Sequence, residues 1–385
     1  MRKVALLIET SNSYARGLMR GISAYLREHE RWLLYLSEGK RGEKVPSWLE
    51  KWKGDGIIVR IENEEIARVI KKLKIPVVDI SSARLIPDLH WVETDDKGVA
   101  ELAANHFIHL GFRNFAFCGD RSFNWSIQRE QHFQRLISKA GYKCHVFNCA
   151  NQQEEASETQ RIAKWLVDLP KPLGLFSSYD YLGRQVLEAC RGNEITVPDQ
   201  VSVLGVDNDD IMCELSEPPM SSVIPNTHLV GYKAAELLER LMSGEHIPAS
   251  PHLIMPIGIA ARRSTDVLAI EDRNTIASLR YIREHACRGI SVKDVIDAVP
   301  QSRRLLESKF KKFLGRTPHE EIISVRIRCA KTLLLETELP LTQIAERTGF
   351  THVEYLNVAF RRETGMPPGR YRHENSRGPR SLYRA

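Results

Sequence analysis

Several polar side chains follow short apolar runs, at positions where a small ligand could be bound. Asp207 and Asn208 come directly after one such run. Asp180 comes after another, and Glu9 and Arg16 lie just beyond the first run of the chain. In open sheets of parallel strands the carboxyl ends of strands meet at one edge, where ligands bind. Carboxylates and amides accept hydrogen bonds, and guanidinium groups donate them, so this set suits a small polar ligand.

A second group of residues with recognisable chemistry is cationic and lies near the carboxyl terminus. From residue 271 onward the sequence has 22 Lys and Arg against 14 Asp and Glu, whereas residues 1–270 have 33 against 35. A local excess of positive charge favours a polyanionic partner. A solvated cationic helix face would produce the same count, so charge alone does not distinguish the two interpretations.

Sequence motifs of enzymes, metal sites and membrane spans are missing. There is no GxGxxG, P-loop or GxSxG, and DNDD at 207–210 lacks the glycine and distal glutamate of a calcium loop. The seven cysteines lack paired CxxC spacing, and the 13 histidines are scattered. No apolar run approaches the roughly 18 residues of a bilayer span. We therefore expect a cytoplasmic protein that is not an enzyme and holds no metal or cofactor.

The elements that must position these residues alternate between strand and helix. Apolar runs predict nine strands, at 3–9, 32–38, 56–60, 75–80, 90–94, 114–119, 143–147, 173–178 and 201–207. Helical patterns lie between several of them, at 17–29, 64–74, 97–111, 127–141 and 183–190. This alternation predicts parallel sheets flanked by helices, and nine strands are more than one small doubly wound sheet commonly holds. We expect an α/β body of two similar lobes with a cleft between them.

The alternation stops near residue 262, and everything beyond it has helical character. The prediction is a sensing domain at 1–262, a polar linker at 263–274, an all-helical domain at 275–374 and a disordered tail at 375–385.

The all-helical region contains one pattern twice. In the first copy a helix capped by Ser291 is followed by a turn and by a helix that begins at Ser302. Leu306, Phe310 and Phe313 would form the buried stripe of that second helix.

The second copy repeats this arrangement. Ile344 and Ala345 would point inward, Gly349 would occupy the turn, and Leu356 and Phe360 would form the stripe. Two helix-turn-helix units joined by a stiff helix suit entry into two successive major grooves of DNA, roughly 34 Å apart.

Residues 344–372, IAERTGFTHVEYLNVAFRRETGMPPGRYR, resemble the second helix-turn-helix signature of the AraC/XylS family of transcription factors. The resemblance covers roughly residues 275–373. It implies that base contacts come from the second helix of each unit, at Arg303, Arg304, Glu307, Ser308, Val353, Glu354, Asn357 and Val358. Phosphate contacts would come from Lys311, Lys312, Arg361 and Arg362. Any one of these residues could instead belong to an ordinary exposed helix face, but the tandem arrangement favours DNA for the set.

The stretch HFIHLGFRNFAFCGD at 106–120 resembles the sensor domains of the LacI/GalR family, which share the fold of periplasmic sugar-binding proteins. The resemblance spans roughly residues 3–262. It implies ligand contacts from Arg16, Arg129, Asp180 and Asp207. Further candidates are a stacking wall from Trp125 or Phe123, the amide of Asn208, and the side chains of Glu9 and Tyr14.

Each candidate has an alternative without a ligand. Asp180 could cap the following helix, Arg16 and Arg129 could form surface ion pairs, and Trp125 could belong to the core. Asp207 is the strongest candidate, because a carboxylate directly after a buried strand needs a partner.

A sugar-sensing body followed by an AraC-type DNA-binding region implies a sugar-responsive transcriptional regulator. The likeness over the whole chain implies an activator that responds to a pentose, D-xylose in the first place. The implied partners are double-stranded DNA, the sugar effector, a second copy of the chain and RNA polymerase, with no membrane. The alternatives are a regulator for another pentose or small polyol, a transport-type binding protein, and a sugar-transforming enzyme.

Overall fold

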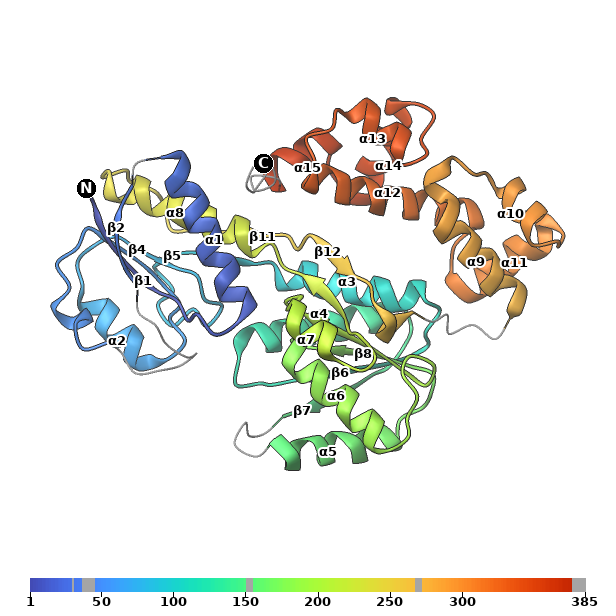
Figure 1. Ribbon diagram of the computed structural model, residues 1–385, viewed down its shortest axis with the longest axis horizontal. Helices are drawn as coiled ribbons and strands as arrows, with labels where there is room; N and C mark the ends of the chain where they lie inside the picture. The colour runs from blue at the N-terminus through green and yellow to red at the C-terminus, as the bar shows by residue number, and fades with distance from the viewer. Residues whose placement is uncertain (30, 37–45, 150–154, 267–271, 376–385) are drawn as a thin grey trace.

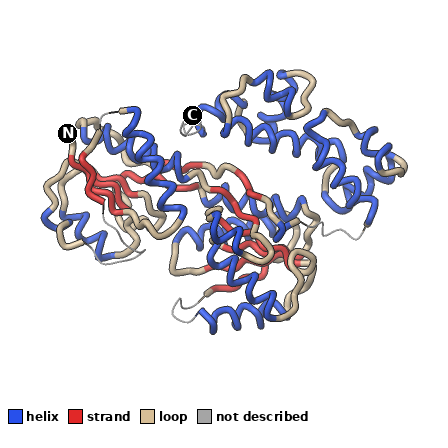
Figure 2. The backbone as a smooth tube through the Cα atoms, in the orientation of Figure 1, coloured by secondary structure: helices blue, strands red, loops and turns tan. Residues whose placement is uncertain are grey.

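The computed structural model describes residues 1–29, 31–36, 46–149, 155–266 and 272–375. Figure 1 shows two α/β lobes and a separate all-helical region that lies across them at the carboxyl-terminal end of the chain. Figure 2 shows the strands of each lobe grouped between helices. The expected fold class is therefore confirmed. In the part of the chain that the structure describes, no helix has the length and apolarity to span a bilayer.

The first lobe is built on six parallel strands in the order β11-β5-β4-β3-β1-β2. These strands are β1 (Lys3–Leu7), β2 (Leu33–Leu36), β3 (Gly56–Val59), β4 (Val77–Asp79), β5 (His90–Thr94) and β11 (Pro251–Ile254). Its helices are α1 (Ser13–Glu28), the 3-10 helix η1 (Leu49–Lys51), α2 (Glu64–Lys72) and α8 (Thr227–Met242).

The second lobe has six strands in the order β12-β10-β9-β8-β6-β7, parallel except for β12. These strands are β6 (Asn114–Gly119), β7 (Cys144–Asn148), β8 (Leu173–Ser177), β9 (Val201–Val206), β10 (Ser221–Ile224) and β12 (Gly258–Ala260). Its helices are α3 (Asp96–His109), α4 (Asn124–Lys139), α5 (Glu155–Val167), α6 (Asp180–Gly192) and α7 (Asp210–Leu215). All nine predicted strands are present, and β10, β11 and β12 are additional to them.

Both faces of the second sheet are buried against helices. In β6, Phe115 and Phe117 pack with α3 and α4, whereas Ala116 and Cys118 pack with α5 and α6. Alternate residues of a strand point to opposite faces, so a run that is apolar throughout predicts a sheet covered on both sides. The chain passes between the lobes after β5, after β10 and between β11 and β12, which leaves the carboxyl ends of both sheets beside these connections.

Helices α1 and α8 of the first lobe pack at close range. A Cβ atom at Gly21 would lie 2.0 Å from the carbonyl oxygen of His228, and one at Gly231 would lie 1.9 Å from that of Leu18. Only glycine permits this approach of two backbones. The packing fixes the start of α1, where Asn12 caps the helix by accepting from the amide of Ala15 at 2.8 Å.

The all-helical region contains both predicted helix-turn-helix units. They are formed by α10 (Val292–Ala298) with α11 (Arg303–Leu314), and by α13 (Leu341–Arg347) with α14 (Val353–Thr364). The remaining elements are α9 (Arg273–His285), the 3-10 helix η3 (Ala286–Arg288), α12 (Pro318–Glu336) and α15 (Pro368–Asn375). The predicted caps are confirmed: Ser291 forms a capping box with Asp294, and Ser302 accepts from the amide of Leu305.

The apolar stripes of the two units differ in one detail from the expectation. Leu306 and Phe310 are fully buried, but Phe313 is half-buried and Leu314 takes the third core position. Steps of three and of four both keep a side chain on one helical face, so the packing of neighbouring elements decides which of the two is fully buried. In the second unit Leu356 and Phe360 are fully buried as predicted.

The predicted linker is ordered at its start. Residues 263–265 form the 3-10 helix η2 (Arg263–Thr265), in which Ser264 donates to the carbonyl of Val203 at 2.6 Å and Thr265 bonds to Ser221 at 2.8 Å. These residues therefore pack on the second lobe. Residues 267–271 of the predicted linker and 376–385 of the predicted tail lie outside the described residues.

Candidate functional site

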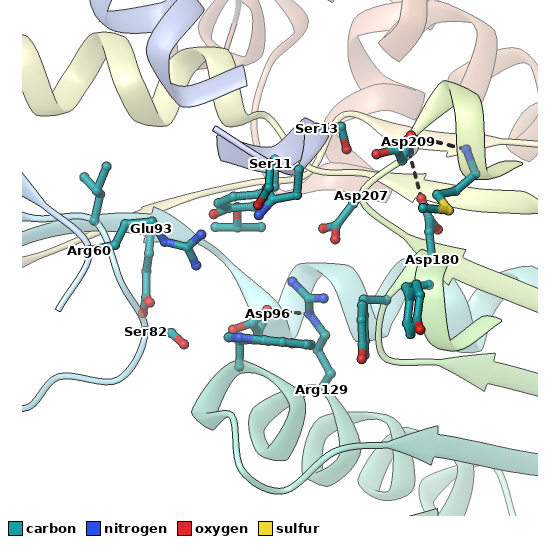
Figure 3. Close-up of a pocket in the computed structure, with 18 residues that line it drawn as sticks. Ser11, Ser13, Arg60, Ser82, Glu93, Asp96, Arg129, Asp180, Asp207 and Asp209 are labelled. Carbon is teal, nitrogen blue, oxygen red and sulfur yellow. Dashed lines mark hydrogen bonds and ion pairs between the residues drawn. The ribbon is translucent and has the colours of Figure 1, made fainter. Parts of the chain in front are cut away.

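A cavity of about 230 Å³ lies between the two lobes, at the carboxyl ends of their strands (Figure 3). The first lobe contributes its polar groups from the start of α1 and the ends of β3 and β5, and the second lobe contributes from α4, α6 and the loop after β9. The lining residues are Ser11, Asn12, Ser13, Tyr14, Arg60, Ile80, Ser82, Glu93, Thr94, Asp96, Trp125, Arg129, Tyr179, Asp180, Tyr181, Asp207, Asp209 and Met212.

One wall of the cavity is organised by Arg129, whose side chain is 4 % exposed. Its Nε donates to the Asp96 carboxylate at 2.7 Å, and its Nη1 donates to the carbonyl of Ser178 at 2.6 Å. Burial opposes the charge of Arg129, but the Asp96 and Asp207 carboxylates outweigh it and raise the pKa of the guanidinium group. Arg129 is thus a fixed cation that can donate to a ligand hydroxyl.

Aromatic rings form a second wall. Trp125 stacks on Phe123 with ring centres 5.1 Å apart, and Tyr179 meets Trp125 edge-on at 5.5 Å. The Arg129 guanidinium carbon lies 4.9 Å from the centre of the Trp125 ring. A flat ring beside charged donors suits the apolar CH face and the hydroxyl rim of a sugar.

Asp180 is almost fully buried, and its carboxylate is bonded to other groups of the protein. Its carboxylate accepts from the amide of Asp209 at 2.8 Å, the hydroxyl of Ser222 at 2.6 Å and the thiol of Cys213 at 3.5 Å. Burial, followed by the charge of Asp207, raises the pKa of Asp180 well above its usual range. A Cβ atom at Gly205 would lie 2.2 Å from Oδ1 of Asp180, so only glycine fits there. Asp180 therefore positions the loop that carries Asp207 and Asp209.

The loop after β9 has an unusual backbone. Asp207 has φ +108° and Asn208 has φ +48°, values that turn the chain sharply at the end of the strand. The amide of Asn208 donates to the Ser222 hydroxyl at 3.0 Å, which supports this turn. Figure 3 shows the Asp207 carboxylate pointing into the cavity, on the side of Arg129.

The first lobe presents Arg60, which is 6 % exposed at its side chain and pairs with Glu9 and with Glu62. The Arg60 guanidinium lies over the Tyr14 ring, 5.3 Å from its centre. The Tyr14 hydroxyl is 3.0 Å from the Thr94 hydroxyl, and burial raises the pKa of Tyr14 to about 12. Tyr14 therefore keeps its proton and offers a hydroxyl to a ligand at neutral pH.

The structure brings five of the eight proposed sugar contacts together on the cavity lining: Tyr14, Trp125, Arg129, Asp180 and Asp207. The other three are not lining residues. Glu9 pairs with Arg60 behind the cavity wall, and the backbone N–H of Asn208 donates to the Ser222 hydroxyl within the turn. Arg16 lies at the rim, where its Nη2 is 3.9 Å from Asp209 of the opposite lobe.

Sequence reasoning missed several lining residues. Arg60 comes directly after β3, and Thr94 is the last residue of β5, so the rule that drew attention to Asp207 applies to both. Asp96, the partner of Arg129, follows β5 by two residues and opens a helix as Asp180 does, so the same rule could have located it. Within the described ranges, no group of three His, Cys, Asp or Glu side chains could hold a metal ion.

The second candidate interface lies on the helix-turn-helix units. Of the proposed base-contacting residues in α11, Arg303, Arg304 and Ser308 are exposed and Glu307 is half-buried. Arg303 donates to Glu307 at 2.9 Å, one helical turn away. The proposed phosphate contacts Lys311 and Lys312 are exposed at the end of the same helix.

In α14 the proposed contact residues differ in how exposed their side chains are. Glu354 is exposed and Val358 is 67 % exposed, whereas Val353 packs against the core of its unit. Asn357 is half-buried, and the proposed phosphate contacts Arg361 and Arg362 are exposed. The second unit therefore offers fewer polar base-contacting groups than the first.

Family models of known proteins match three segments of the chain. The model described as the XylR N-terminal domain matches residues 3–97, the periplasmic binding protein-like domain matches 104–265, and a helix-turn-helix domain matches 296–374. The xylose operon regulatory protein of Escherichia coli K12 is 31% identical over 97% of both chains. The chain belongs to the xylose operon regulatory protein family. The protein of that name from Haemophilus influenzae is 30% identical over 96% of this chain and 98% of its own.

A solved structure of a xylose-binding transcription activator, xylR, supports the membership of this family. It is 30% identical, covers 97% of this chain and 98% of its own, and has a TM-score of 0.63. A complex of the regulator CelR with cellobiose shares the fold of the lobes, with 21% identity over 68% of this chain and a TM-score of 0.59. The prediction of a transcriptional regulator with a periplasmic-binding-like body and a helix-turn-helix region is confirmed.

Proposed function

We propose that this protein is a D-xylose-responsive transcriptional activator that binds tandem sites on double-stranded DNA through α11 and α14. The observation that carries the proposal is the cavity between the lobes, where fixed charges and an aromatic wall face each other, in a chain that ends in two helix-turn-helix units.

The sugar would be held by both lobes. Arg129 and Arg60 donate to ring hydroxyls, Asp207 accepts from them, and Trp125 covers the apolar face of the ring. Contacts from both lobes favour the closed arrangement, and the ligand shifts that equilibrium by its difference in affinity for the two states. As a sensor, the protein would release the sugar unchanged.

The remaining expectations belong to this proposal. The sensing domain would be 1–262, joined to the DNA-binding domain at 275–374 by residues 263–274, with 375–385 as a tail. The regulator would act in the cytoplasm as a homodimer and contact RNA polymerase at the promoter.

Calorimetry with the full chain tests which sugar it binds, with D-xylose, L-arabinose and D-ribose as ligands. D-xylose should bind best, with one site per chain. Asp207→Ala should weaken xylose binding by about tenfold or more, because the ligand loses a charged acceptor. Asp199→Ala, an exposed carboxylate of the same lobe, is the matched control and should bind like the original protein.

Fluorescence anisotropy tests the DNA response. A promoter fragment from the organism's xylose-utilisation genes should bind more tightly than its scrambled version, and xylose should increase the difference. Asp207→Ala should keep the basal affinity for this fragment and lose the increase. Equal affinity for the two fragments, with and without xylose, would exclude the proposed function.

A further inference from the structure

A second cavity, of about 460 Å³, lies where the second lobe, η2 and the helix-turn-helix region meet. We call it the interdomain cavity. Four arginines line it: Arg262 and Arg263 from the segment after β12, Arg283 from α9 and Arg328 from α12. The end of α3 closes one side with His106.

The four guanidinium groups have few partners of opposite charge. Arg262 donates to the carbonyl of Met220 at 3.0 Å, and Arg283 donates to that of His109 at 3.4 Å. Among the described residues, no carboxylate lies within 4.0 Å of any of the four. Asp266 is the one acidic side chain in the described lining. The lining therefore carries an excess of positive charge, which Glu321 and Asp266 offset only in part at Arg283.

A neighbouring arginine shows the contrast. Arg316 pairs with Glu321, which is fully buried, so the fold supplies a carboxylate where an arginine needs a structural partner. The pKa of His106 in α3 is lowered to about 3. Burial is the main cause, and the positive charges of Arg328 and Arg283 add to it. His106 is neutral and already bonds to Thr265 at 3.0 Å, so the cationic character of the cavity comes from arginine alone.

We propose that the interdomain cavity binds a small phosphate-bearing anion and is a second effector site, distinct from the sugar cavity. The planar fork of a guanidinium group matches phosphate oxygens, and several such groups around one partly enclosed space hold a dianion better than a monovalent ion. Because the arginines come from both the second lobe and the helix-turn-helix region, the bound anion stabilises the arrangement in which these two parts face each other.

Calorimetry on the full chain tests this site, with inorganic phosphate, pyrophosphate and a pentose 5-phosphate at constant ionic strength, in the presence and in the absence of saturating xylose. At least one of them should bind saturably, once per chain. Binding of the inorganic ions would assign recognition to the phosphoryl group, and binding of the pentose phosphate alone would assign it to a phosphate ester. Arg263→Gln/Arg328→Gln should weaken the binding by about tenfold or more, since two charge-assisted contacts are lost.

The matched control is Arg280→Gln/Arg288→Gln, which removes two exposed arginines of the helix-turn-helix region outside the cavity. It should leave anion binding unchanged. Arg263 and Arg328 are themselves exposed, so their replacement should leave the melting temperature of the protein intact.

Four results would overturn the proposal. The first three are the absence of saturable binding of all three anions, equal weakening in both double variants, and displacement of the anion by xylose. A fourth is displacement by duplex DNA together with an equal loss of duplex affinity in Arg263→Gln/Arg328→Gln, which would identify the arginines as contacts to the DNA backbone.

Discussion

The sugar cavity and the surface of α11 and α14 hold their charged side chains in opposite ways. In the cavity Arg129 and Asp96 are both at least nine-tenths buried and bonded at 2.7 Å. On α11 Arg303 is 72 % exposed at its side chain and pairs only with a residue of its own helix. A small rigid ligand is bound best by groups already in position, whereas long exposed cations can follow phosphates along a duplex. Burial therefore distinguishes the site for a defined small molecule from the surface for a polymer.

The acidic groups of the two regions show the same contrast. Burial raises the pKa of Asp79 and of Glu93 to about 7 in the first lobe. In the helical region the ion pair with Lys309 lowers the pKa of Asp272, and the amide of Thr317 lowers that of Glu320. Lobe carboxylates are costly to ionise, whereas those of the helical region are stabilised as anions by caps and pairs.

The largest expected effect comes from breaking the buried pair. Arg129→Met leaves the Asp96 charge buried without its partner, which should lower the free energy of unfolding by about 3 to 5 kcal/mol. Arg303→Met, which breaks the exposed pair with Glu307, should cost less than about 1 kcal/mol. All six tryptophans lie in residues 1–262, so tryptophan fluorescence in a urea titration reports the lobes. Hydrogen exchange of the backbone amides of α9 to α15 reports the helical region.

A compensating variant tests whether the unpaired Asp96 charge causes the loss of stability. Arg129→Met/Asp96→Leu removes both charges and should recover much of the stability lost in Arg129→Met. Equal costs for Arg129→Met and Arg303→Met would show that burial does not separate the two regions.

The second effect is on the pH dependence of stability. Asp79 has a folded-state pKa of about 7 against 3.8 when unfolded, so between these values the folded state binds a proton that the unfolded state lacks. The free energy of unfolding of the lobes should then fall as pH rises through this window, by on the order of 4 kcal/mol from Asp79 alone. Asp79→Asn should flatten this slope in pH-dependent urea titrations, whereas Asp199→Asn should not.

The helical region should respond in the opposite direction. Because the folded-state pKa values of Asp272 and Glu320 are lowered, their contribution is present above pH 4 to 5 and is lost as pH falls further. Hydrogen exchange of the backbone amides of α9 to α15, measured at decreasing pH and corrected for the intrinsic exchange rate, checks this. Parallel pH slopes for lobes and helices would contradict the contrast.

The smallest expected effect is on DNA affinity, and it separates base contacts from phosphate contacts within α11. Arg304→Ala should weaken binding to the specific promoter fragment by about 1 to 3 kcal/mol and leave binding to scrambled DNA nearly unchanged. Lys311→Ala should weaken both equally and reduce the slope of log affinity against log salt by about 1. Anisotropy titrations at several KCl concentrations measure both quantities. If the two variants changed specific and scrambled binding in the same proportion, Arg304 would be a phosphate contact.

Much of the local structure could be predicted from the sequence. The apolar runs located all nine expected strands, and the caps at Ser291 and Ser302 located two helix starts. Strand ends pointed to Asp180 and Asp207, because ligand groups in parallel sheets gather there. These signals are local: each depends on a period or a turn within about ten residues.

Contacts between segments distant in the sequence add roles that the sequence did not predict. Asp180 lines the cavity, and the close approach of Gly205 and the bonds to Ser222 and Cys213 also make it a support for the loop that carries Asp207. Arg129 needed Asp96 as its partner, 33 positions away. No pattern in either segment shows that the two will meet.

The sequence alone therefore determined the class of each element, the alternation that builds two lobes and the cationic helices that follow them, because these depend on side-chain period and local capping. Only the tertiary structure decided which polar groups share a cavity and which are neutralised behind its wall. It also placed Arg262, Arg263, Arg283 and Arg328 around one space. The physical reason is that burial and pairing, which set the charge state and the position of a side chain, depend on segments far apart in the chain.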